Sequence, residues 1–191
     1  MPNWADVCYK CVGDLKEVRS LHNAIKKNAK RKNPRVKNGF GTLWLGCIID
    51  QLGGDWEKYP CRGEITDYNI DDDGVLVISQ NCAWGEQRGF RRFIEKTFPS
   101  IKVYFQEQES GCGVFHTNSF EYFPERYFLD SYEDWEFFET IEEAATHVSI
   151  IVGHEVEADA NIIEKTLDRY VEEHEDEDLF YSFHEFAEVD D

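Results

Sequence analysis

The positions of the apolar residues divide the first part of the chain into short strands and helices. Residues 4–12 are typical of a strand, and after them apolar residues recur every three or four positions from Leu15 to Ala29, which predicts an amphipathic helix. Asn33-Pro34 ends this helix after a basic run. The elements expected next are an apolar helix over residues 43–52, strands over 64–70 and 75–81, a helix over 87–98 and a strand over 101–108.

These elements follow one another in the order β-α-(α)-β-β-α-β. This is the order of a ferredoxin-like sandwich with one additional helix, in which helices cover one face of a four-stranded antiparallel sheet. A further hairpin formed by residues 114–118 and 120–129 is expected to extend the sheet, with Pro124 at an edge or a bulge. The sequence therefore predicts an α+β protein built on a ferredoxin-like sandwich.

The C-terminal part shows its own α/β pattern. It consists of an expected strand over residues 134–139, a helix that begins with the capping-box spacing Thr140-x-x-Glu143, a helix over residues 158–174 and a strand over residues 178–186. The end of the first helix is rich in β-branched residues, so a strand over residues 147–152 stays an alternative. We predict a ferredoxin-like domain with an extra hairpin over residues 1–130, and an acidic C-terminal subdomain over residues 131–191 packed on it.

Charge is distributed unevenly along the chain. Residues 1–130 hold 18 Lys+Arg and 18 Asp+Glu, whereas residues 131–191 hold 2 and 21, which accounts for the net charge of −19. The first forty residues carry ten basic and three acidic side chains. Such a chain can fold its ends against each other or present its acidic end to a basic partner, and both alternatives stay open. An aromatic content of 15 % indicates that the acidic part is folded.

The N-terminus and the cysteines predict a cytoplasmic protein that does not span a membrane. The chain begins without a basic and apolar leader, and no window contains about 18 consecutive apolar residues. Six cysteines without a secretion signal favour free thiols over disulfides. Cys8 and Cys11 form a C-x-x-C, but residues three apart in a strand face opposite sides of a sheet, so neither a zinc site nor a redox pair is expected.

Several short segments, taken in their order along the chain, resemble the YubB/Api-like family. They are Met1-Pro2-Asn3-Trp4, Gly53-Gly54-Asp55-Trp56, Cys61-Arg62-Gly63-Glu64-Ile65, Asn81-Cys82-Ala83-Trp84, Gly111-Cys112-Gly113-Val114-Phe115 and Pro124-Glu125-Arg126-Tyr127. The resemblance covers residues 2–130 and does not clearly include the acidic part. It implies a ferredoxin-like domain encoded on plasmids, integrative islands or conjugative transposons. The family comprises uncharacterised proteins, so the resemblance implies no activity and no catalytic residues.

Three patterns resemble sites of known chemistry, and each has a simpler structural reading. Asn69-x-Asp71-x-Asp73-Gly74 matches the first half of an EF-hand loop, but strands flank it and Gln80 occupies the twelfth position, so a hairpin turn is favoured. Three His-Glu pairs lack a second histidine four residues after the first. These pairs are His154-Glu155, His174-Glu175 and His184-Glu185. Cys112 precedes His116 by four residues, which alone is weak evidence for a nucleophile and its base. The sequence predicts no catalytic, cofactor or metal site.

A basic run at the end of the first helix is a candidate for phosphate contact. It comprises Lys26, Lys27, Lys30, Arg31, Lys32, Arg35 and Lys37. The strand over residues 101–108 lacks the glycine-rich lead of an RNA-binding signature, and a net charge of −19 repels a polyanion. A solvated helix end, or a docking segment for the acidic part, is therefore favoured over direct nucleic-acid binding.

Two functional hypotheses follow from these observations. The first is a non-catalytic protein-interaction module of a mobile element, which uses the ferredoxin-like sheet or its edge to bind an unidentified protein partner. The alternative is an acidic DNA mimic, whose 21 C-terminal carboxylates occupy a DNA-binding enzyme such as a restriction system. A folded helix with a solvated acidic face is a third, purely structural reading of the same charge.

Overall fold

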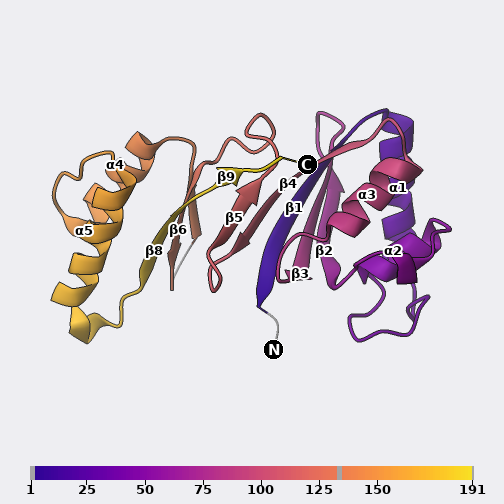
Figure 1. The fold of residues 1–191 in the computed structure, drawn as a ribbon, viewed down its shortest axis with the longest axis horizontal. Helices are drawn as coiled ribbons and strands as arrows, with labels where there is room; N and C mark the ends of the chain where they lie inside the picture. Colours follow the sequence, from indigo (N-terminus) through magenta and orange to yellow (C-terminus); the bar gives the residue numbers. More distant parts are fainter. Residues whose placement is uncertain (1–2, 133–134, 191) are drawn as a thin grey trace. The chain divides into compact units, whose positions relative to one another are not determined.

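The chain is an α+β protein made of two compact units. The computed structural model in Figure 1 describes residues 3–132 and 135–190, and these contain five α-helices, a six-strand mixed sheet and a three-strand antiparallel sheet. Unit 1 is Met1–Val114 and unit 2 is Phe115–Asp191. The domain boundary after residue 130 stays a prediction. No helix in the described ranges has the length and apolar character required to cross a membrane.

Unit 1 contains four strands in the order β2-β3-β1-β4, each antiparallel to its neighbour. They are β1 (Trp4–Val12), β2 (Gly63–Ile70), β3 (Leu76–Ala83) and β4 (Lys102–Glu109). The helices are α1 (Leu15–Ala29), α2 (Leu45–Gln51) and α3 (Arg88–Thr97), with a short 3-10 turn, η1, over Trp56–Lys58. Figure 1 shows all three α-helices on the same side of this sheet. The predicted order of helices and strands up to β4 is confirmed.

Local sequence explains how these elements begin and turn. The Asp14 side chain accepts a hydrogen bond from the backbone N–H of Lys16 at 2.8 Å, which satisfies a free donor at the start of α1. Between β2 and β3, the carboxylate of Asp71 accepts from the backbone N–H groups of Asp73 and Val75, and Gly74 adopts a φ of +83°. The predicted hairpin turn is thus confirmed, and Asp71 serves the turn itself.

Unit 2 contains a three-stranded antiparallel sheet in the order β7-β6-β8 and two helices. The elements in chain order are β5 (Val114–Thr117), β6 (Tyr127–Ser131), β7 (Trp135–Phe138), α4 (Ile141–Val152), α5 (Ala160–Glu173), the 3-10 turn η2 (Glu175–Glu177), β8 (Tyr181–Glu185) and β9 (Ala187–Glu188). One core joins Leu129, Phe138 and Phe183 of the sheet to α4 and α5. A second cluster of buried side chains consists of Phe115, Phe128 and Phe186.

The second predicted hairpin was wrong, because residues 114–118 and 120–129 do not pair with each other. β6 begins only at Tyr127 and pairs with β7 and β8, while β5 pairs in parallel with β9. The segment before β6 contains Pro124, which has no N–H for a ladder, and a turn in which Phe123 N–H donates to the Ser119 carbonyl. The end of the predicted second strand does form a strand, β6, but β6 belongs to the sheet of unit 2 and buries Leu129 against α4 and α5.

The helix predicted after Thr140 forms, and the alternative strand over residues 147–152 was wrong. Thr140 and Glu143 make the reciprocal hydrogen bonds of a capping box, and the helix ends at Gly153 with a φ of +76°. Val148 is fully buried, so packing outweighs the β propensity of this stretch. The predicted strand over residues 134–139 appears as β7, although its first residue lies outside the described ranges.

Replacing Thr140 by alanine tests the capping box. The Thr140→Ala variant loses the acceptor for the Glu143 N–H, and we expect the free energy of unfolding to fall by about 1 kcal/mol. Thr146→Ala, the same change at an exposed position inside α4, is the matched control and is expected to change it by less than about 0.5 kcal/mol. Chemical denaturation measures both variants, and equal losses would show that the cap does not stabilise the helix.

Candidate functional site

Each histidine of the three His-Glu pairs makes a local hydrogen bond, and His154 and His174 line the same pocket beside α5. His154 Nδ1 is 3.1 Å from the Glu155 carbonyl, and His174 Nδ1 is 2.8 Å from the Tyr170 carbonyl. His184 Nε2 is 2.7 Å from the Ser182 hydroxyl, and burial lowers the pKa of this histidine. In the described ranges, no three His, Cys, Asp or Glu side chains are grouped so that they could hold a metal ion. The prediction that the protein has no metal site stays a prediction.

The cysteines of unit 1 lie in contrasting surroundings. Cys8 and Cys11 are in β1, where Cys11 is buried and Cys8 is partly exposed, as the C-x-x-C in a strand predicted. Burial raises the pKa of the Cys61 thiol to about 11 and also raises the pKa values of Cys11 and Cys82. Cys112 is exposed, but its hydrogen bond with the Glu109 carboxylate raises the pKa of its thiol. An activated thiolate nucleophile would need the opposite shift.

Thiol labelling tests this assignment. We expect iodoacetamide to modify Cys112 first in the native protein, and its rate to keep rising above the ordinary thiol pKa of 9.0, because the thiolate is the reactive form. Cys11, Cys47 and Cys82 have no exposed surface and should react only after unfolding. Mass spectrometry locates the label, and Cys112→Ser is the control. Labelling of Cys11 or Cys82 ahead of Cys112 would contradict the assignment.

The basic run ends α1 and continues into the loop that follows. Each of its seven side chains is exposed. Arg35 forms an ion pair with Asp50 at 2.5 Å and donates to the Gln51 side-chain oxygen at 3.3 Å. This contact fixes the loop against α2, which is consistent with a solvated helix end.

A buried charged network in unit 1 was not predicted from the sequence. Glu86 Oε1 accepts a hydrogen bond from the Tyr9 hydroxyl at 2.5 Å and forms an ion pair with Arg91 Nε at 3.0 Å. The Glu86 N–H donates to Glu107 Oε2 at 2.5 Å, and the Arg91 guanidinium lies 5.0 Å from the centre of the Phe105 ring. Tyr9, Arg91 and Glu107 are all buried. The network therefore joins the start of α3 to β1 and β4.

Burial is the main electrostatic influence on this network. It raises the pKa of the Glu86 carboxyl, while Arg91 and Tyr9 act in the opposite direction. Burial also raises the pKa of Tyr9 well above its ordinary value. The network adjoins a turn in which Trp84 and Gly85 have φ values of +71° and +142°. These side chains are buried and bond to one another, so we interpret the network as a structural support for this turn rather than as a reaction centre.

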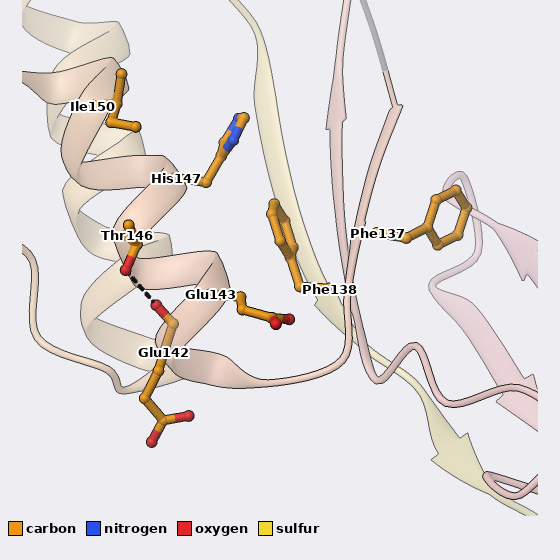
Figure 2. A pocket seen from close by; sticks show the side chains of 7 residues that line it. All are labelled: Phe137, Phe138, Glu142, Glu143, Thr146, His147 and Ile150. Atoms are coloured by element: carbon orange, nitrogen blue, oxygen red, sulfur yellow. Dashed lines mark hydrogen bonds between the residues drawn. The ribbon is translucent and has the colours of Figure 1, made fainter.

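The candidate binding site lies along α4 in unit 2. A groove of about 520 Å³ runs between α4 and β7 and is lined by Phe137, Phe138, Glu142, Glu143, Thr146, His147 and Ile150. Figure 2 shows that Phe138 and His147 lie between the helix and the strand, whereas Phe137 points to the other side of β7. The ring centres of Phe138 and His147 are 5.3 Å apart. The groove therefore has an aromatic floor.

A second groove follows the other side of the same helix. It has a volume of about 530 Å³ and is lined by Glu142, Ala145, Thr146, Ser149, Glu155, Val156, Glu157 and Ala158. Glu142 and Thr146 border both grooves, and Ile150 continues their row with the same four-residue spacing. Ile150 is 78 % exposed. We call the row Glu142-Thr146-Ile150, together with the two grooves beside it, the α4 face.

The α4 face combines apolar surface with carboxylates. Glu142, Glu155 and Glu157 are exposed, and neither groove is lined by a lysine or an arginine. Glu143 is already committed to the capping box, where its carboxylate accepts from the Glu139 and Thr140 N–H groups. Sequence reasoning missed this site, although one signal was available: Ile150 lies outside the buried stripe Ala144-Ala145-Val148 on an otherwise polar face.

Comparisons with models of protein families, with curated proteins and with solved structures found no match for this chain. The resemblance to the YubB/Api-like family and the mobile-element setting that it implies therefore stay predictions, and the case for a function depends on the α4 face and on the charge of unit 2.

Proposed function

We propose that this protein is a non-catalytic protein-interaction module of a conjugative or other mobile element, and that unit 1 is a ferredoxin-like domain. The strand order β2-β3-β1-β4, with every neighbouring pair antiparallel and the helices on one side, supports the ferredoxin-like assignment. The α4 face is the observation that carries the proposed interaction, because the exposed Ile150 borders a groove with an aromatic floor, and apolar surface that is continuous in this way is typical of a site that another protein covers.

The charge of unit 2 indicates the kind of partner. Unit 2 contains 3 Lys+Arg and 24 Asp+Glu, which gives a net charge of 3 − 24 = −21. Unit 1 contains 17 and 15, which gives +2. The field around a surface with this charge attracts basic proteins and repels nucleic acids. We therefore propose a basic protein as the partner of unit 2.

A pull-down from nuclease-treated host lysate tests the proposal, with the full-length protein as bait and stepwise elution by salt. We expect one partner to stay bound through high salt, because a packed interface depends less on screened surface charges than an electrostatic one. The triple variant Glu164→Gln, Asp168→Asn, Glu172→Gln removes three exposed charges from α5 and should retain the same partner. Absence of any salt-resistant partner would contradict the interaction module.

The DNA mimic is a second candidate, and the sequence of α5 favours it. Exposed Glu164, Asp168 and Glu172 repeat every four residues, so they line one side of the helix. Like charges at this spacing destabilise a helix by a few tenths of a kcal/mol, so helix stability does not account for them. If the protein is a DNA mimic, several DNA-binding proteins should elute from the full-length bait at moderate salt. The variant with the three α5 substitutions should then capture markedly less of each of these proteins.

A further inference from the structure

The α4 face has the shape and the charge to receive a helix. We infer that the α4 face is the docking site for an amphipathic helix of the basic partner; this inference rests on the proposed function. The apolar side of that helix packs against Ile150 and into the groove floored by Phe138 and His147. Its Lys and Arg side chains lie against Glu142 and the carboxylates of the second groove.

The geometry of α4 favours a helix over an extended peptide. Glu142, Thr146 and Ile150 form a ridge with a four-residue spacing. A groove lies on each side of Glu142 and Thr146, and Ile150 borders the first groove. Helices pack by placing the ridges of one into the grooves of the other, and this ridge with its two grooves provides half of such an arrangement. The ridge spans nine residues, from Glu142 to Ile150, or about 12 Å of helix axis, which matches about two turns of a partner.

The charges around the ridge select a cationic helix. Three exposed glutamates, Glu142, Glu155 and Glu157, border the grooves without a lysine or arginine among the lining residues. An acidic helix would be repelled here, and a neutral one would leave these carboxylates without counterions at the interface. Amphipathic helices recognised in this way present apolar anchors at i, i+3, i+4 and i+7. The ligand class is thus a basic amphipathic helix.

Fluorescence anisotropy with the full-length protein tests this inference. The probe is a labelled leucine-lysine peptide of about 18 residues, long enough to form a helix, with leucines every three and four residues. A peptide of the same composition in scrambled order is its control. Ile150→Glu places a charge in the apolar contact, and Asn161→Glu adds the same charge at an exposed position of α5 that lines neither groove.

The two variants separate docking from simple charge attraction, because attraction alone would make every added carboxylate strengthen the binding of a cationic peptide. We expect the amphipathic peptide to bind more tightly than the scrambled one, and Ile150→Glu to weaken that binding by about tenfold. Asn161→Glu should not weaken it. Equal binding of the two peptides, no binding of either, or unchanged or tighter binding by Ile150→Glu would overturn the inference. The proposed function would then still stand or fall with the pull-down, which does not depend on the α4 face.

Discussion

Replacing Arg91 by methionine is expected to lower the free energy of unfolding by about 3–5 kcal/mol at neutral pH. The substitution keeps much of the side-chain volume but leaves the Glu86 carboxylate buried without its cationic partner, which lies 3.0 Å away in the wild type. Breaking a buried ion pair from one side costs far more than the pair contributes, because the remaining charge is still removed from water. It also removes the cation that lies over the Phe105 ring.

The pH dependence of this loss identifies its cause. The pKa of Glu86 in the folded state is raised above its ordinary value of 4.5, so its ionisation costs stability as pH increases through this range. Without Arg91 the pKa rises further, and protonation then relieves the unpaired charge. We therefore expect the Arg91→Met deficit to be smaller at about pH 5 than at about pH 7.5.

Arg92→Met is the matched control, since Arg92 is the neighbouring arginine of α3 and is exposed. We expect this variant to stay within about 0.5 kcal/mol of the wild type. Urea denaturation at the two pH values measures all three proteins. A deficit of equal size for both arginines, or one for Arg91 that does not change with pH, would contradict the account of the network.

Replacing Phe128 by alanine is the second change with a large expected effect, a loss of about 3–5 kcal/mol. Phe128 is almost fully buried in β6, and its ring centre lies 5.0 Å from that of Phe137, 5.7 Å from that of Phe115 and 6.0 Å from that of Trp135. The substitution opens a cavity and removes several aromatic contacts, each of which contributes about 0.5–1.5 kcal/mol beyond burial.

Phe137→Ala, in the partner position on β7, provides the comparison. Phe137 is 39 % exposed, so its replacement removes less buried surface than the replacement of Phe128. The Phe137→Ala variant should therefore lose clearly less stability than Phe128→Ala. Guanidinium denaturation followed by circular dichroism measures both variants. Similar losses for the two phenylalanines would show that Phe128 is not the centre of this aromatic cluster.

The parts of the fold that were predicted correctly depend on local signals. The spacing of apolar residues located α1 and α3, the aspartates before Gly74 indicated the turn between β2 and β3, and Thr140 with Glu143 indicated the start of α4. Each of these signals lies within one element or at its end, where propensity, capping and turn geometry act directly.

The parts that were not predicted depend on contacts between distant residues. Alternation around Leu129 indicates that one side of a strand is buried, but it does not say which strand pairs with it, and β8 lies more than fifty residues later. The Glu86 network is equally non-local, because Tyr9 and Glu86 are 77 residues apart. Charged residues are rarely buried, so no pattern in the sequence pointed to Arg91 as a core residue.

The same limit applies to the candidate site. The buried stripe of α4 consists of Ala144, Ala145 and Val148, which repeat with a helical period. Ile150 falls outside that stripe, but whether an extra apolar residue is buried or exposed depends on what packs beside the helix. Only the positions of β7 and of the segment after Gly153 reveal the two grooves, and Ile150 is exposed at the first of them.

Hydrogen–deuterium exchange tests the central claim most directly, using the full-length protein with and without the partner retained at high salt in the pull-down. If unit 2 binds this partner through the α4 face, backbone amides of Ile141–Val152 and of residues 155–158 should exchange more slowly in the complex. Protection confined to β2 at the edge of the unit 1 sheet, or to the acidic side of α5, would contradict the account.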